Sequence, residues 1–395
     1  MLLTNVRPWA GSPVDLEIDG GAITALRPAT SEPDAAGPDA GRIDGQGLLA
    51  LPGLVNAHAH IDKTWWGKPW VPNPPARDLN ERIALERTHR DRLGLPDVRS
   101  IAEQLREYVR HGTTAIRSHV DVDPGVGLRG LEAVREAETD VGADVALELI
   151  AFPQDGVLRR PGVDKLLDDA AAWGLAQYIG GLDPATIDRD PVGQLDVLFD
   201  IAERHGVGID IHLHDRGELG AFEFELIIER TRQRGLAGKV TIAHGFGLAT
   251  VDAGRQRDLI AELADSGVAL TTVAPMTGNQ LPVADLAEAG VPLGLGTDGV
   301  RDLWTPHGDG DMLRLAGTLA ARCGWRRDDQ LEAALRVAAN GYFVGRPGAG
   351  LTVGARADVV LVDAETVAEA VVAAPRRELV LAGGREVVRA GRFTA

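Results

Sequence analysis

Eight short apolar runs, separated by stretches with helical periodicity, constrain the fold of this chain more than any other feature of its sequence. They recur every ~30–40 residues, the spacing expected of strands that alternate with helices. Intervening stretches such as Ser100–Arg110, Pro191–His205 and Leu219–Arg234 are amphipathic. Strand–helix alternation is typical of parallel sheets, and eight repeats predict an α/β chain folded as a (β/α)8 TIM barrel. The runs are Leu51–Ala57, Thr114–Val120, Val145–Phe152, Ala176–Ile179, Val207–Leu213, Lys239–His244, Val268–Val273 and Val291–Gly296.

A doubly wound open sheet is the competing architecture. It would place a glycine-rich phosphate-binding turn after an early strand. The sequence contains neither GxGxxG nor GxxxxGK[ST], so the barrel is favoured.

The two ends of the chain have a different, β-rich texture. Val14–Ile18 and Ala22–Leu26 flank a Gly20-Gly21 turn, and short apolar segments follow Asp358 and Glu378. We predict one small β-sandwich domain built from residues 1–51 and 347–395, around a barrel of residues 52–346. The alternative is two unrelated β extensions.

Charge and composition exclude several classes of function. A formal net charge of −17 would repel phosphate, which argues against nucleic-acid and anionic-membrane partners. Cys323 is the single cysteine, so no internal disulfide forms. No apolar stretch is long enough for a transmembrane helix, and the first residues do not resemble a signal peptide. A cytoplasmic location is therefore expected.

Unusual polar residues follow the predicted strands. Barrel enzymes carry their chemistry at the carboxyl ends of the strands. Residues i and i+2 of a strand share a face, so the first run presents both imidazoles of His58-Ala59-His60 to one side. Any one such residue could be structural, but several in one barrel mouth indicate a metal site for a cation such as zinc or iron. The other strand ends carry His212, His214, Asp215, His244 and Asp298.

Four segments carry a resemblance to a known family. They are Leu51–Lys63, the Arg117-Ser-His-Val-Asp121 segment, the Ala151-Phe-Pro-Gln-Asp-Gly156 segment and Asp298–Pro306. These segments resemble the amidohydrolase superfamily, and within it the cytosine deaminase branch. The resemblance implies a metal-dependent hydrolase of carbon–nitrogen bonds other than peptide bonds.

The resemblance also implies roles for individual residues. One divalent metal ion, zinc or iron, would be held by His58, His60, His212 and Asp298. His244 would hydrogen-bond the tetrahedral intermediate and Asp298 would take the proton of the attacking water. Gln154 would bind the amide edge of the ring and Trp304 would line the pocket. Asp215 keeps the spacing of the branch's acid/base glutamate, with Glu218 as a competitor; alternatively, Asp215 only caps the next helix.

The absence of a lysine at the fourth strand favours a single metal ion. Superfamily members with two ions generally bridge them with a carboxylated lysine there. Residues 177–184 contain no lysine, although Asp183 could serve as a bridge.

Gly299 and Lys63, like Asp215, depart from the cytosine deaminase pattern. Gly299 replaces a second aspartate, which we expect to leave room and remove a negative charge. Lys63 stands where cytosine deaminase has a threonine, and a lysine at this position resembles N-isopropylammelide hydrolase. If buried near the metal, Lys63 would have a depressed pKa or pair with an electronegative ring substituent. Alternatively, it is a surface lysine paired with Asp62. Arg301 adds another cation, so Lys63 and Arg301 predict a carbonyl-rich ring. Trp65, Trp66 and Trp70 form either a lid over the pocket or a subunit contact.

The prediction is therefore a deaminase that acts on a small nitrogen heterocycle by attack of metal-activated water. The enzymatic alternative is dealkylamination of a substituted triazine or hydrolysis of a cyclic amide. A remote alternative is a non-catalytic scaffold. The expected partner is a small heterocyclic substrate, and formation of a homo-oligomer is left open.

Overall fold

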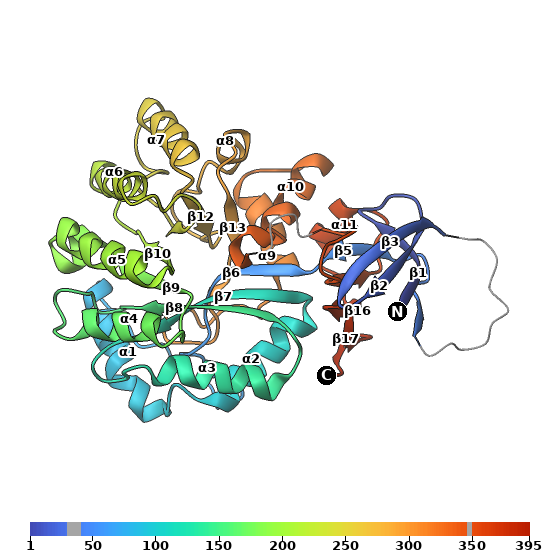
Figure 1. Cartoon of the computed structure of the whole chain (residues 1–395), viewed down its shortest axis with the longest axis horizontal. Helices are drawn as coiled ribbons and strands as arrows, with labels where there is room; N and C mark the ends of the chain where they lie inside the picture. The colour runs from blue at the N-terminus through green and yellow to red at the C-terminus, as the bar shows by residue number, and fades with distance from the viewer. Residues whose placement is uncertain (30–40, 346–349) are drawn as a thin grey trace.

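The predicted barrel is present in the computed structural model, which describes residues 1–29, 41–345 and 350–395. Its strands are parallel and follow one another in chain order around the sheet (Figure 1). The last strand is split: its first part, β13 (Leu293–Leu295), pairs with β12, and its second part, β14 (Asp298–Gly299), pairs with β6 and closes the barrel. The other strands are β6 (Leu54–His60), β7 (Thr113–Asp121), β8 (Ala146–Phe152), β9 (Tyr178–Leu182), β10 (Gly208–His212), β11 (Val240–Ala243) and β12 (Ala269–Thr272).

Helices surround this sheet and bury its outer face (Figure 1). Each of the eight apolar runs overlaps a barrel strand, so the predicted fold is confirmed. Within the described ranges, no helix combines the length and apolar character needed to cross a membrane. The helices are α1 (Leu79–Leu93), α2 (Val98–Arg110), α3 (Arg129–Val141), α4 (Val163–Ala172), α5 (Pro191–His205), α6 (Gly217–Gln233), α7 (Ala253–Ser266), α8 (Val283–Glu288), α9 (Met312–Arg322), α10 (Asp328–Ala338) and α11 (Val367–Ala373).

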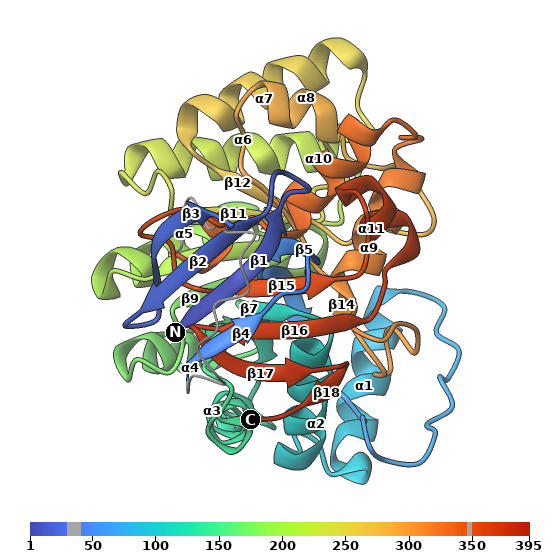
Figure 2. The same cartoon turned by 90° about the vertical axis from the view of Figure 1, so that its right-hand side faces the viewer.

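The two ends of the chain join in a second, nine-stranded sheet beside the barrel (Figure 2). The junction is the antiparallel pair β5 (Leu49–Pro52) and β15 (Val359–Val362), in which Ala50 faces Leu361. Side chains from both ends, including Leu3, Val359 and Leu381, form one buried apolar cluster. The β-rich unit is thus assembled from both termini as predicted. The exact domain limits stay a prediction, and the limit between residues 346 and 347 lies outside the described residues. The remaining strands are β1 (Leu2–Pro8), β2 (Val14–Asp19), β3 (Ala22–Pro28), β4 (Arg42–Asp44), β16 (Arg377–Ala382), β17 (Arg385–Arg389) and β18 (Arg392–Phe393).

A close approach between the first and last barrel strands positions the site. Gly296 lies between β13 and β14, and a Cβ at this residue would stand 2.3 Å from the carbonyl oxygen of His58. Only glycine permits this contact. The register that follows sets Asp298 opposite Ala59 and therefore between His58 and His60.

Candidate active site

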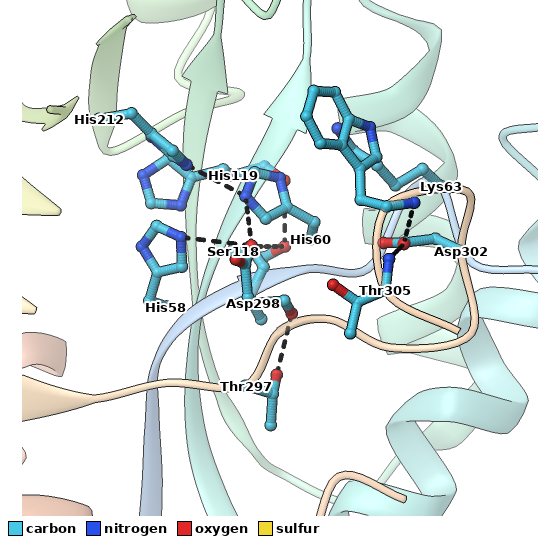
Figure 3. A network of polar contacts seen from close by, with 12 residues as sticks. His58, His60, Lys63, Ser118, His119, His212, Thr297, Asp298, Asp302 and Thr305 are labelled. Carbon is cyan, nitrogen blue, oxygen red and sulfur yellow. Dashed lines mark hydrogen bonds and ion pairs between the residues drawn. The ribbon is translucent and has the colours of Figure 1, made fainter. Parts of the chain in front are cut away.

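Four histidines from three barrel strands converge at one end of the barrel (Figure 3). His58 and His60 come from β6, His119 from β7 and His212 from β10, and potential ligand atoms of all four lie within 4.8 Å of one another. The Nε2 atoms of His60 and His212 are 3.2 Å apart. Asp298 Oδ1 lies 3.4 Å from His60 Nε2 and 3.8 Å from His58 Nε2. All five side chains therefore surround one small volume.

The protonation state of these histidines fits a metal ion. Burial, followed by the neighbouring positive groups, lowers the pKa of His58, His60 and His212 well below the ordinary value. The neutral imidazole is the form that binds metals. Both ring nitrogens of His58, and Nδ1 of His60 and His212, are buried without a hydrogen-bond partner. Buried polar atoms without a partner are rare in proteins, and a divalent cation bound by these histidines would supply a partner for one nitrogen of each ring.

His119 is held differently from the other three. Its Nε2 atom lies 3.3 Å from Oδ1 of Asp210 on β10, and both side chains are fully buried. Neither ring nitrogen of His119 has a hydrogen-bond partner among the described residues, so the Asp210 contact is a close approach without a hydrogen bond.

Three of the predicted residues have unusual backbone conformations. His244 has φ 65°, Asp298 has φ 60° and Arg301 has φ 50°, in the left-handed region that non-glycine residues seldom adopt. Such conformations cost free energy and occur preferentially at functional sites. The His244 ring lies 4.9 Å from the ring of His58 and 4.4 Å from that of His214.

A polar cavity of about 130 Å³ opens directly beside this cluster. It contains predicted metal ligands together with the predicted ring-binding residues Gln154, Lys63 and Trp304. The lining residues are His60, Lys63, Leu79, Gln154, His212, His214, His244, Asp298, Asp302, Trp304 and Thr305.

Lys63 is a buried cation in the wall of this cavity. Its Nζ atom lies 2.9 Å from Asp121 Oδ1 and 3.4 Å from Glu86 Oε1, and it donates to Gln154 Oε1 at 2.9 Å. Burial alone would lower the pKa of Lys63, but these carboxylates raise it above the ordinary value. Two sequence-based interpretations are therefore wrong: Lys63 is not a surface lysine, and its pKa is not depressed. Because Gln154 Oε1 accepts from Lys63, the amide nitrogen is the end of Gln154 available to a ligand.

The structure does not bring Arg301 into this cavity. Its guanidinium lies 3.9 Å from the ring centre of Trp66, a cation–π contact, and neither residue lines the cavity. Trp65 is buried and Trp70 is 66% exposed, and none of the three loop tryptophans lines the cavity. Trp304 does line it, and its indole nitrogen donates to Glu86.

At the end of the fifth strand, the cavity receives His214 instead of Asp215. His214 Nδ1 lies 2.8 Å from Asp183 Oδ2, and this contact raises the pKa of His214 although burial opposes the shift. Asp215 accepts a hydrogen bond from Thr186 Oγ1 at 2.6 Å and is not among the lining residues, and the Glu218 side chain is 73% exposed. The sequence contained the signal for His214, because His212 and His214 repeat the i, i+2 spacing of His58 and His60.

Comparisons with known proteins agree with this geometry. Residues 97–395 match the model of the amidohydrolase family. The chain belongs to this family. It is also 30% identical to the N-isopropylammelide isopropyl amidohydrolase of Pseudomonas sp. (strain ADP), over 88% of each chain. An uncharacterized protein of Escherichia coli is 34% identical, over 77% of this chain and 66% of its own length. Carbon–nitrogen bond hydrolysis is thus the activity of this amidohydrolase.

Solved structures of relatives cover the whole of this amidohydrolase. N-isopropylammelide isopropylaminohydrolase from Burkholderia multivorans superposes with a TM-score of 0.93 at 44% identity, over 100% of this chain and 99% of the relative. 5-Methylcytosine deaminase from Klebsiella pneumoniae superposes with a TM-score of 0.84 at 25% identity, over 100% and 98%. The predicted amidohydrolase resemblance is therefore confirmed.

A second and larger cavity adjoins the polar one in this amidohydrolase. It measures about 380 Å³ and shares Asp298 and Thr305 with the first. The surface of its wall is mainly apolar, and its lining also includes charged residues such as Asp311 and Arg314. The apolar residues are Val273, Ala274, Pro275, Met276, Val300 and Leu315.

Proposed function

We propose that this amidohydrolase uses one divalent metal ion to hydrolyse an exocyclic carbon–nitrogen bond of an oxo-rich nitrogen heterocycle, with an alkylamine as the leaving group. One observation carries the proposal: a polar cavity and an apolar cavity meet at Asp298, a predicted metal ligand. The ring belongs in the polar cavity, and a substituent on the leaving nitrogen belongs in the apolar one.

His58, His60, His212 and Asp298 would hold the ion, which when bound lowers the pKa of a water molecule towards neutrality. Imidazole and carboxylate ligands suit both zinc and iron. A single ion is supported by Asp183, whose two carboxylate oxygens accept from the backbone nitrogen and from Nδ1 of His214. These contacts oppose a role for Asp183 as a bridge to a second ion.

The ring would contact both a polar and an apolar side chain of the cavity. The amide nitrogen of Gln154 can donate to a carbonyl oxygen of the ring, while Lys63 fixes the other end of that amide by donating to Oε1. Trp304 offers a flat apolar surface for the ring to stack on.

The reaction adds water across the bond between the ring carbon and the exocyclic nitrogen. The ring carbon gains a carbonyl group, and the amine leaves with a proton. Asp298 and His244 both line the cavity; Asp298 is proposed to take up the proton of water, and His244 to hydrogen-bond the tetrahedral intermediate. For delivery to the leaving nitrogen, the sequence suggests Asp215, but His214 has the better position because it lines the cavity.

Deamination is the second candidate function. The polar cavity alone would accommodate a ring with an unsubstituted amino group, and one relative is named as a 5-methylcytosine deaminase. The two functions differ only in the leaving group.

Amine release from three compounds separates these functions. N-Isopropylammelide presents an isopropylamino group on a dioxo ring, ammelide presents an amino group on the same ring, and cytosine presents an amino group on a mono-oxo ring. We expect kcat/KM at least about tenfold higher for N-isopropylammelide than for ammelide, and weak or no turnover of cytosine. Preference for ammelide would establish the deaminase, and release from none of the three would contradict both functions.

A further inference from the structure

Asp302 is a cavity residue whose two carboxyl oxygens have different surroundings. Oδ1 accepts hydrogen bonds from the backbone nitrogens of Trp304 at 2.8 Å and Thr305 at 2.6 Å. Oδ2 is buried and has no hydrogen-bond partner among the described residues, and the whole residue is 1% exposed. The backbone therefore fixes the carboxyl group through one oxygen and leaves the other unused.

The free oxygen occupies the space of a missing side chain. A Cβ at Gly299 would stand 1.9 Å from Asp302 Oδ2, much closer than real atoms approach. The expectation that Gly299 leaves room is wrong, because the carboxyl group of Asp302 fills that space. Glycine at 299 is what leaves space for the Asp302 carboxyl group.

We propose that Asp302 is a substrate-binding residue whose Oδ2 forms a hydrogen bond with an oxo group of the bound heterocycle. The inference rests on the function proposed above. Asp302 lines the same polar cavity as Gln154 and Lys63, and Figure 3 shows it beside Lys63 and Thr305, next to the histidine cluster. A buried polar atom without a partner is costly, and a ring oxygen in this cavity would supply the partner.

The expected protonation state suits a carbonyl ligand. Burial raises the pKa of Asp302 to about 8, although the backbone nitrogen of Thr305 and the charge of Lys63 oppose the shift. At pH 7 the group is then largely a neutral acid. Because Oδ1 already accepts two hydrogen bonds, the proton belongs on Oδ2, where it can be donated to an oxo group.

Binding of cyanuric acid, a ring with three oxo groups and no leaving amine, tests the inference without turnover. Tryptophan fluorescence can follow it, since Trp304 lines the cavity. Asp302→Asn keeps the acceptor at Oδ1 and places an amide donor at Oδ2, so its Kd should stay within about threefold of wild type. Asp302→Ala and Gly299→Ala should each weaken binding by at least about tenfold. Gly299→Ala keeps the Asp302 carboxyl group but displaces it. This variant therefore still tests the inference if Asp302→Ala does not fold.

Equal affinity of all four proteins would overturn the role of Asp302, and so would a wild type that does not bind cyanuric acid. A loss in Asp302→Asn as large as in Asp302→Ala would also overturn it, because the donor is retained there. A wild type that binds cyanuric acid but releases no amine from N-isopropylammelide would contradict only the proposed function.

Discussion

Asp183 orients His214: its Oδ2 lies 2.8 Å from Nδ1 of the imidazole, and its Oδ1 accepts from the backbone nitrogen of the same residue. A carboxylate on Nδ1 sets which nitrogen of a histidine faces the other side of the ring. Nε2 of His214 is thereby left to the cavity, next to His244. Asp183 thus acts as a positioning residue for the proposed chemistry.

Paired variants decide between His214 and Asp215 as the acid/base group. We expect His214→Asn to lower kcat about 10²–10⁴-fold, the usual effect of losing a positioned acid/base, with metal content unchanged. Asp215→Asn should lower kcat much less, because its carboxylate contacts Thr186 outside the cavity. Steady-state kinetics with N-isopropylammelide measure both. The reverse order of effects would restore Asp215 to the role that the sequence suggested.

His60→Ala tests the metal site. His60 contacts both His212 and Asp298, so its loss opens the centre of the ligand set. We expect metal content, measured by elemental analysis, to fall below stoichiometry while circular dichroism stays unchanged. His89→Ala is a matched control, because its ring nitrogen contacts the carbonyl of Leu85 in helix α1. Stoichiometric metal in His60→Ala would remove His60 from the ligand set.

Lys63→Met should destabilise the fold. Lys63 is the cation between buried Asp121 and Glu86, and removing one partner of a buried ion pair typically costs about 3–5 kcal/mol. Urea unfolding measures the loss, and adding Asp121→Asn to the same chain should recover part of it. A loss below about 1 kcal/mol, the usual value of an exposed pair, would contradict the burial of this charge.

Glu223 should make stability fall with rising pH. Burial, and after it the neighbouring Asp215 and Asp183, raises the pKa of Glu223 from an ordinary 4.5 to about 9. The folded state then holds a proton that the unfolded state loses, so this contribution is complete below pH 4.5 and disappears as pH rises through 9. Between pH 5 and pH 9 we expect the unfolding free energy of Glu223→Gln to decline less than that of wild type. Parallel declines would contradict the raised pKa.

The fold was predictable because the regular spacing of the apolar runs and their number are compatible with few folds. Each barrel strand is a buried apolar run between helical stretches. The candidate metal ligands come directly after these runs in the sequence, so their place at the strand ends could be predicted as well. His58, His60, His212 and Asp298 lie together because parallel strands end on one face of the barrel.

Features that depend on contacts between distant segments were not predictable. The pKa of Lys63 depends on Asp121 and Glu86, which come from β7 and α1. The space at Gly299 is filled by Asp302 through a loop whose path the sequence pattern does not specify. Arg301 and Asp215 stand next to residues that line the cavity, but each side chain contacts a group outside it.

Isopropylamine release from N-isopropylammelide, measured as a function of bound metal per chain, tests the central claim most directly. Protein stripped with a chelator should release no amine. Activity should return in proportion to added zinc or iron(II) and reach its maximum at one ion per chain. Turnover by the metal-free protein, or a maximum only at two ions per chain, would contradict the account.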